Sequence, residues 1–420
     1  MVKGVTLVKD LALARSIGPS AELDTMIVVS TLILAGISIG PAALAAAVIP
    51  VSERLRSQQG QASALAFNRM VLASVTLLLS LVTALLMLGA TPILTAYVPR
   101  LATGSLPLLR TVFWILGPML VFSGLSALLG ALLQAEGQFG PVAWATVCGP
   151  ALTILALAWG TGPFLRVPVG LLLGVILELG LLAIWYRHGW GPLSVHDRGL
   201  RTALAEANQH YLPVLAGGVL MTSTTLVDVF MAARLPPGTT TVVNLASRLP
   251  NGFSTLAMAA LGSAALPLFS RLVAEGRIRE LRHTLLHFVC RILGIGIPVA
   301  VLLALASPWI ARLAFAHGHT HLDSARLIGR VQAMYFLQLP FYLCSIFLVR
   351  AISALQQNRV LLLGAVISAG LNVGLDLLFI RWMGPPGIAL STVVVYFVAC
   401  LYMAAWVRHF LRINPAREGA

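Results

Sequence analysis

The stretch from Met70 to Leu88 reads MVLASVTLLLSLVTALLML and contains no charged residue. A helix of this length is about as long as the ~30 Å of hydrocarbon in a bilayer is thick. Comparable apolar runs recur along the chain, for example at Val112–Leu133, Val167–Tyr186 and Gly387–Trp406. We therefore expect helices that cross a membrane rather than the half-polar helices of a water-soluble domain.

The composition of the whole chain agrees with this interpretation. Of the 420 residues, 58% are hydrophobic and 10% are charged, and the mean hydropathy is +0.92. Soluble domains usually carry about 25% charged residues, so this chain has too little polar surface to cover a globule in water. We predict an all-α polytopic membrane protein with about 12 transmembrane helices. The predicted segments are 2–17, 24–52, 67–98, 109–134, 140–160, 164–186, 210–234, 240–272, 283–315, 327–355, 359–382 and 387–411.

The basic residues give the chain a formal net charge of +14. They gather in alternate connections between the apolar segments, the arrangement that marks the cytoplasmic side of a membrane protein. They do not form one cluster with interleaved aromatic residues, so we expect no nucleic-acid partner. The pattern predicts a multi-pass protein in contact with membrane lipids. The arginines concerned are Arg54, Arg56, Arg69, Arg187, Arg198, Arg201, Arg271, Arg277, Arg279, Arg282, Arg408, Arg412 and Arg417.

An internal repeat predicts two halves. The stretch IPVSERL from Ile49, followed by Gly60, is echoed by LPLFSRL from Leu266, followed by Gly276. Asp10 with its following Ala-Arg is echoed by Asp228 with its own, and these motifs are offset by 217 to 219 residues, the two glycines by 216. An even number of predicted spans separates the copies, so the two six-helix bundles should be parallel. We predict one bundle over 1–200, whose first helix is short or truncated, and the other over 201–420.

Charged and amide side chains inside the apolar segments are the candidate functional residues, because ionisable groups at bilayer depth are costly. Asn372 and Asp376 are four residues apart and share one face of a predicted helix. Their oxygens suit a hard cation, with Thr392 and Asp228 as further ligands. The spacing by itself favours a hydrogen bond between packed helices, which is a common use of polar residues in membranes.

Arg248 is followed by Pro250 and Gly252, which should weaken the helix at that point. Its guanidinium in a wet cavity could hold phosphate through a bidentate fork. Snorkelling from a helix end to the membrane interface explains the same residue equally well.

Other motifs carry little chemistry. His317, His319 and His321 with Asp323 alternate on one connection, and the sequence offers no second cluster to close a metal site. No catalytic motif is present, so we expect a protein that is not an enzyme.

Three stretches of the second half carry a resemblance to a known family. They read NLASRL from Asn244, LPLFSRLVAEG from Leu266 and RAISALQ from Arg350. In the first half, Lys9-Asp10 stands where the family has Arg-Asp, and Leu23-Asp24 stands where it has an aspartate before its second helix. On these motifs the chain resembles the lipid II flippase (MurJ, formerly MviN) family of the multidrug/oligosaccharidyl-lipid/polysaccharide exporter superfamily.

The resemblance implies a function as well as a fold. The fold would be two six-helix bundles forming a V around a cationic central cavity. That cavity would take the head group of an undecaprenyl-pyrophosphate-linked saccharide and expose it alternately to each side of the bacterial inner membrane. Lys9 and Arg248 match cavity cations of the family. The predicted substrate-binding residues are Lys9, Asp10, Arg15, Asp24 and Arg248.

The resemblance also implies a sodium site, and it changes the preferred interpretation of the Asn372–Asp376 pair from a helix contact to a cation site. We therefore predict Na⁺ as a coupling or structural ion and no organic cofactor. The predicted ligands are Asp228, Asn372, Asp376 and Thr392, with a backbone carbonyl from Ile388.

The chain departs from the family pattern at several positions. The family's paired arginines of the second helix align with Gly36 and Ile37, and the chain ends after twelve segments where some members carry two more. We accordingly expect a monomeric flippase for lipid II or for an exopolysaccharide unit. The alternatives are a cation-coupled exporter of drugs or metabolites from the same superfamily, and a homologue that transports nothing.

Overall fold

All regular structure in the described part of the chain is helical, because a backbone in lipid must satisfy its polar groups within the segment. The computed structural model describes residues 2–158, 164–190, 224–257, 263–316, 321–355 and 357–413. The chain divides into two compact units, Met1–Leu226 and Val227–Ala420. The predicted division at residue 200 lies in 191–223, outside the described residues, and stays a prediction.

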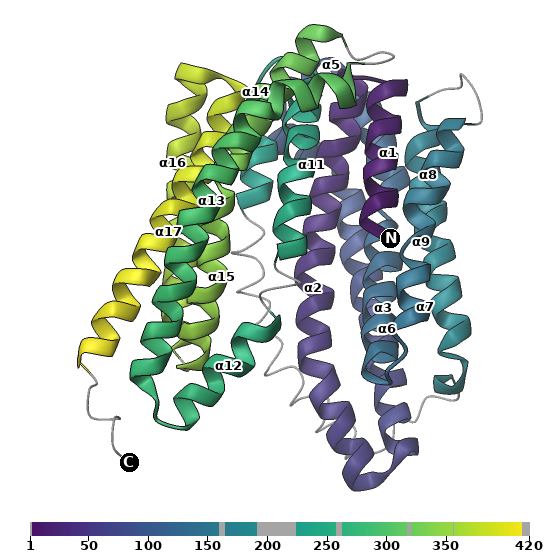
Figure 1. The fold of residues 1–420 in the computed structure, drawn as a ribbon. Coiled ribbons are helices and arrows are strands. Elements are labelled where there is room, and N and C mark those ends of the chain that lie inside the picture. The colour runs from purple at the N-terminus through teal and green to yellow at the C-terminus, as the bar shows by residue number, and fades with distance from the viewer. Residues whose placement is uncertain are drawn as a thin grey trace. The chain divides into compact units, whose positions relative to one another are not determined.

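The first unit opens with one short and one long helix, traced in purple in Figure 1. The 15 residues of α1 extend over only ~22 Å at 1.5 Å per residue, whereas the 39 residues of α2 exceed a bilayer. Ser20 caps α2, because its Oγ accepts the Leu23 amide at 3.2 Å. The helices are α1 (Val2–Ser16), α2 (Ala21–Gln59), α3 (Gln61–Leu88), α4 (Ala90–Tyr97), α5 (Pro99–Leu116), α6 (Met119–Ala135), α7 (Phe139–Ala145), α8 (Cys148–Ala158) and α9 (Arg166–Trp185), followed by the short 3₁₀ helix η1 (Arg187–Gly189).

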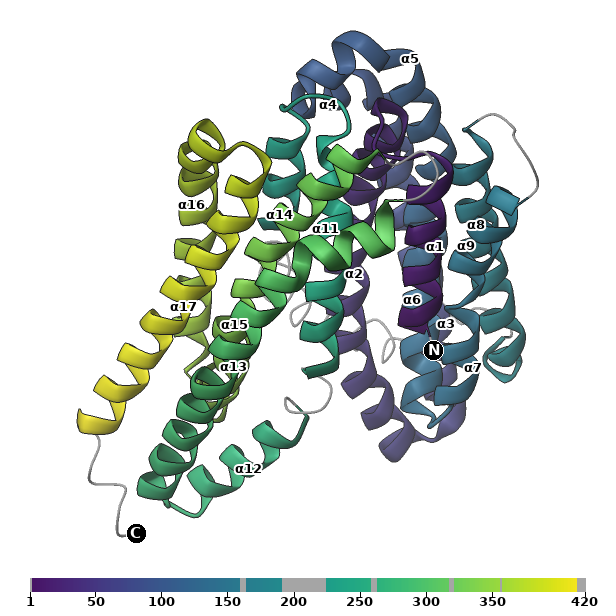
Figure 2. The same cartoon turned by 45° about the horizontal axis from the view of Figure 1, so that its top comes forward.

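The second unit begins in a helical run over residues 224–232. Its long helices are α13 and α17, and each packs on α14 and α15. The turquoise-to-yellow part of Figure 1 shows this unit, in which α16 and α17 lie side by side (Figure 1, Figure 2). The helices are α11 (Thr239–Ala257), α12 (Ser263–Ala274), α13 (Ile278–Phe315), α14 (Leu322–Leu337), α15 (Leu339–Ala354), α16 (Asn358–Met383) and α17 (Pro385–Ile413).

Eight candidate spans in the described residues are long and apolar enough to cross a membrane. They coincide with eight of the twelve predicted segments, so the all-α membrane class is confirmed. The segment 210–234 lies mostly outside the described residues, and the count of twelve stays a prediction. The eight are Gln61–Leu88, Ser105–Ala135, Phe139–Ala158, Arg166–Trp185, Ile278–Phe315, Leu322–Ala354, Arg359–Met383 and Pro385–Phe410.

The outer surfaces of these spans are apolar. Leu88, Leu313 and Trp382 are each at least three-quarters exposed. In water such surface would drive aggregation, but in a bilayer lipid chains cover it at no cost. The helices therefore need no polar outer face, which explains why the sequence shows continuous apolar runs instead of an amphipathic stripe.

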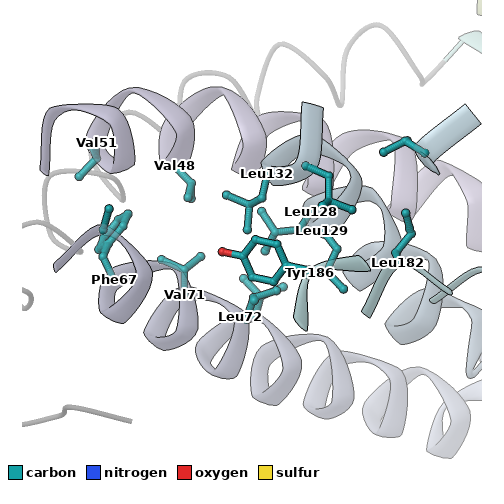
Figure 3. Packing of buried hydrophobic residues seen from close by; sticks show 14 of the residues in the cluster. Val48, Val51, Phe67, Val71, Leu72, Leu128, Leu129, Leu132, Leu182 and Tyr186 are labelled. Carbon is teal, nitrogen blue, oxygen red and sulfur yellow. The ribbon is translucent and has the colours of Figure 1, made fainter. Parts of the chain in front are cut away.

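A core of branched and aromatic side chains holds α2, α3, α6 and α9 together (Figure 3). Phe67, Leu128 and Leu132 point into it from two helices, and Tyr186 lies at its centre with its ring fully buried. The amide Nδ2 of Asn68 donates to the Tyr186 hydroxyl at 3.2 Å. This bond satisfies both polar groups inside an otherwise apolar core, as burial requires.

Glycines set the spacing of α8 and α9, which lie side by side in Figure 2. A Cβ placed on Gly174 would lie 2.5 Å from the Cα of Gly149 and 2.9 Å from the carbonyl oxygen of Cys148. A Cβ on Gly170 would lie 2.7 Å from that of Ala156. Small residues of this kind let membrane helices pack backbone against backbone, where van der Waals contact is the main source of stability.

Both copies of the predicted repeat are followed by a glycine in the left-handed region. Gly60 and Gly276 both have positive φ, 90° and 70°, a conformation that glycine adopts without strain. Leu55 and Leu272 precede these turns and are buried in the core of their own unit. The local structure thus agrees with the repeat, while the parallel arrangement of the two bundles stays a prediction.

Ion pairs brace the turn between α12 and α13. Glu275 accepts from Arg271 at 2.6 Å and from Arg277 at 2.8 Å, and Arg277 also pairs with Glu280 at 2.6 Å. Hydrogen bonds from Arg271 and Arg277 hold the pKa of the Glu275 carboxyl below its ordinary value. Because these groups are exposed, water screens the pairs, and they contribute less to stability than the buried core does.

We predict that Gly174→Ala lowers the melting temperature of the detergent-purified protein, because the added methyl forces α8 and α9 apart. The matched control is Gly180→Ala in the same helix, where a Cβ meets nothing within 4 Å. Alanine there should be neutral or stabilising, since glycine costs a helix about 1 kcal/mol. Equal melting temperatures of the two variants would show that the α8–α9 contact is not close-packed.

Candidate functional site: an oxygen-lined cluster in the second unit

A glycine turn brings α17 against α16. Gly384 ends α16 with a φ of 65°, and Pro385 begins α17 at once. A Cβ on Gly387 would lie 2.5 Å from the carbonyl carbon and oxygen of Phe379. Only a residue without a side chain allows this approach, so the first turns of α17 lie directly against the last turns of α16.

The turn places the sequence-predicted residues of α16 beside a third chain segment. Asn372 and Asp376 lie one helical turn apart and are 1% and 0% exposed. Asp228, in the helical run 224–232, is half-buried. The amide Nδ2 of Asn372 donates to Oδ1 of Asp228 at 3.1 Å. The structure therefore brings Asn372 and Asp228 together, and their role in a site stays a prediction.

The early residues of α17 complete the cluster. Thr392 Oγ1 lies 3.5 Å from Oδ2 of Asp228 and donates to the carbonyl oxygen of Ile388 at 3.1 Å. Ser391, which the sequence prediction missed, donates from Oγ to Oδ1 of Asp376 and lies 2.7 Å from the same Ile388 oxygen. The signal was weak, since serine is common in membrane helices and Ser391 belongs to no motif.

The cluster contains two acidic side chains and, among the described residues, no basic one. The carboxyl groups of Asp228 and Asp376 are close enough to repel one another. In the described part of the chain, neither forms an ion pair with lysine, arginine or histidine. Oδ2 of Asp376 and Oδ1 of Asn372 are buried acceptors to which no hydroxyl or N–H group donates, and the carboxyl groups of Asp228 and Asp376 are within hydrogen-bonding range of one another. Buried acceptors without donors and buried charges without partners are both costly, so the cluster is suited to a positive ligand.

Arg248 lies on α11, where the structure corrects part of the sequence prediction. The helix does not break at Pro250, because α11 runs without interruption from Thr239 to Ala257. Arg248 is therefore in the middle of the described helix rather than at its end, which weakens the case for snorkelling. Its Nη2 donates to Oδ1 of Asn244, one turn earlier, at 2.9 Å. This bond orients the half-buried guanidinium.

The other predicted binding residues lie in the first unit. Lys9 Nζ pairs with Asp10 at 3.2 Å, and the two side chains are 15% and 5% exposed. Asp24 is buried in the first turn of α2, where a carboxylate is favoured by the helix dipole. Arg15 is exposed in the last turn of α1. The structure thus pairs Lys9 with Asp10, and the roles of all four residues stay predictions.

The histidine-rich connection shows no metal site in the part that the structure describes. His317 and His319 lie outside the described residues. Asp323 pairs with Arg326 at 3.2 Å. Among the described residues, no three His, Cys, Asp or Glu side chains gather in a way that could hold a metal ion.

The family model for lipid II flippase MurJ matches residues 13–417 of this chain. The chain belongs to the lipid II flippase MurJ family. Three curated relatives named Probable lipid II flippase MurJ are similar in sequence. The protein of Bdellovibrio bacteriovorus is 25% identical over 291 residues, 68% of this chain and 53% of its own length. The protein of Thermotoga maritima is 28% identical over 193 residues, which are 46% of this chain and 38% of its own length. The protein of Rhizobium meliloti is 25% identical over 321 residues, which are 72% of this chain and 58% of its own length. The chain thus spans about half the length of these relatives.

Two solved structures share the fold. Lipid II flippase MurJ in an inward closed conformation matches with a TM-score of 0.79 and 20% identity, over 97% of this chain and 86% of the other. A multidrug resistance MATE family transporter in its inward-facing conformation also matches with a TM-score of 0.79. Its sequence is 15% identical, and the match covers 99% of this chain and 96% of the other. At such identities the likeness concerns the fold alone.

We predict that Gly387→Ala disturbs this cluster, because the methyl pushes the start of α17 away from Phe379. The melting temperature should fall, with a cost of about 1–3 kcal/mol for overpacking. Gly370→Ala is the matched control, since Gly370 is exposed on α16 and its Cβ would meet nothing within 4 Å. A Gly387→Ala protein as stable as this control would mean that α16 and α17 do not depend on the close approach.

Proposed function

We propose that the protein flips a polyprenyl-pyrophosphate-linked saccharide across the bacterial inner membrane by alternating access, as a monomer and not as an enzyme. Its membership of the lipid II flippase MurJ family, matched over residues 13–417, carries this proposal. The two-unit helical architecture supports it, because transport by alternating access needs two bodies that can move against one another. The substrate is lipid II or an exopolysaccharide unit.

The anionic head group of such a substrate requires positive charge inside the protein. We assign this role to Arg248 and Lys9, with Asp10, Arg15 and Asp24 as further binding or orienting groups. Arg248 is held by Asn244, so its fork is oriented before a pyrophosphate arrives. Lys9 is held by Asp10 and offers a point charge, which binds phosphate without a fixed geometry.

Sodium is the ion that we assign to the cluster of the second unit. Asp228, Asn372, Asp376, Thr392 and the Ile388 carbonyl supply oxygen ligands of the kind that hard cations prefer. The orphaned acceptors Oδ2 of Asp376 and Oδ1 of Asn372 fit a cation better than a neutral ligand. The bound ion would neutralise the repulsion between the two carboxylates and so tie α16 and α17 to residue 228.

A second candidate is a cation-coupled exporter of drugs or metabolites, favoured by the equal TM-score of the MATE family transporter. A cationic drug calls for an acidic or aromatic binding site, whereas Arg248 and Lys9 are basic. Growth of an overexpressing strain on toxic organic cations separates the two functions, because only the drug exporter should protect the cells. A protein that moves no labelled lipid-linked saccharide in liposomes, and protects no cells, would be a non-transporting homologue.

We predict that NaCl, but not KCl at equal ionic strength, raises the melting temperature of the detergent-purified protein. A ligand at 100 times its Kd stabilises the folded state by about 2.7 kcal/mol. Asp376→Ala should abolish the sodium response, since it removes an anionic ligand. Identical melting temperatures in both salts for the unmodified protein would remove sodium from the proposed function.

We predict that Arg248→Ala reduces flipping of labelled lipid-linked saccharide in liposomes by roughly tenfold or more, the size expected for a lost hydrogen bond to a charged group. Arg248→Lys should restore part of the rate, because it returns the charge without the fork. The control is Arg326→Ala, which removes an exposed arginine paired with Asp323. Unchanged flipping in the Arg248→Ala protein would exclude Arg248 from substrate binding.

A further inference from the structure

Ser391 contacts another helix of the cluster as well as its own. It is fully buried on α17. Its Oγ reaches two acceptors, Oδ1 of Asp376 on another helix and the carbonyl oxygen of Ile388, three residues earlier on its own. A hydroxyl carries one proton and can donate it to one acceptor at a time. Ser391 can therefore donate its proton either to the carboxylate of Asp376 or to the carbonyl of Ile388 at any one time.

Thr392 repeats this arrangement on the other carboxylate. Its Oγ1 lies 3.1 Å from the Ile388 oxygen and 3.5 Å from Oδ2 of Asp228. Two adjacent hydroxyls thus share one carbonyl as an acceptor, and each has one carboxylate as its alternative. Adjacent residues on a helix point about 100° apart, which is why two neighbours can reach two different acidic groups.

Serine and threonine in membrane helices often donate to the carbonyl three or four residues earlier. Such back-bonding explains the contacts with Ile388, but it does not explain the contact between Ser391 and Asp376. Among the described residues, Ser391 is the one side-chain hydroxyl or amide that donates to Asp376. Without it, both oxygens of a fully buried carboxylate would lack a hydroxyl or amide donor, since Oδ2 already does.

We propose that Ser391 is a positioning residue of the cation site, acting on both Asp376 and the Ile388 carbonyl. By donating to Oδ1, it fixes the carboxylate and leaves Oδ2 as the available ligand. When a cation engages the Ile388 carbonyl, the proton of Ser391 turns fully to Asp376, and that of Thr392 to Asp228. Each hydroxyl then stabilises one carboxylate in its charged form. The inference rests on the proposed sodium site and adds a residue to it.

A matched pair of variants isolates the hydroxyl. Ser391→Thr and Ser391→Val introduce side chains of nearly the same shape, and of the two only threonine keeps the Oγ. The measurement is the melting temperature of each full-length protein in detergent as NaCl replaces choline chloride, which yields a sodium concentration at half-maximal stabilisation. Ser391→Ala serves as the third variant in case the added methyl groups prevent folding.

We expect the sodium midpoint of Ser391→Val, and of Ser391→Ala, to rise roughly tenfold or more, the effect of one lost hydrogen bond to a charged group. Ser391→Thr should stay within about threefold of the unmodified protein. A residue that only packs the helix would change the sodium-free melting temperature and leave the midpoint alone.

The outcomes separate the two proposals. If the unmodified protein responds to sodium and the valine and threonine variants share one midpoint, Ser391 has no positioning role and the sodium site stands. If the unmodified protein shows no sodium response, the proposed sodium site is wrong, and the proposed role of Ser391 is wrong as well. Lithium, tested alongside, should show the same loss in Ser391→Val, because the hydroxyl acts on the ligands and not on one particular ion.

Discussion

Two neighbouring carboxylates inside an apolar helical unit are the constraint around which the second unit is arranged. Asp376 is fully buried, and Asp228 is close enough to repel it. Transferring such charges out of water costs several kcal/mol unless hydrogen bonds or opposite charges compensate. The described residues supply donors from one amide and two hydroxyls, all neutral, while the Ile388 carbonyl is a further acceptor. The donors reduce the cost without cancelling the charge, so the cluster gains most from a ligand that is itself positive.

That cluster depends on a backbone feature some distance from the charges. The absence of a side chain at Gly387 lets α17 touch the backbone of α16 at Phe379. Asp376 lies just under one turn before Phe379, and Ile388 follows Gly387 directly, so the contact sets the distance between the carboxylate and its neighbours on α17. The glycine thus fixes the site through packing, although it contributes no ligand. The same approach leaves little room for adjustment, because both surfaces at the contact are backbone.

The helices were predictable from the sequence, and every residue of the cluster except Ser391 was named there, for identifiable physical reasons. Membrane spans were predictable because lipid demands long apolar runs, and Asn372 with Asp376 because residues four apart share a helix face. The pairing of Asn372 with Asp228 joins residues 144 positions apart. Residue type had named Asp228 as a further oxygen ligand, and the family resemblance favoured its place in the same site. Ser391 was missed because its partner depends on how closely two helices approach. The sequence suggested a weakened helix at Pro250, yet α11 continues through it. The loss of one backbone hydrogen bond does not break a helix that its neighbours hold in place.

The predicted repeat suggests why the cluster belongs to the second unit. The IPVSERL and LPLFSRL stretches are offset by 217 residues, and the same offset pairs Gly170 with Gly387 and Gly174 with Ser391. In the first unit these two glycines bring α9 into backbone contact with α8, and neither could carry a larger side chain without moving a helix. In the second unit the matching positions carry the glycine that packs on Phe379 and the hydroxyl that donates to Asp376. Both helix pairs are therefore closed by glycine contacts, and in the second unit polar groups whose balance a cation can change are added to that contact. If the halves move against one another during transport, this difference makes α16 and α17 the pair through which cation binding can act.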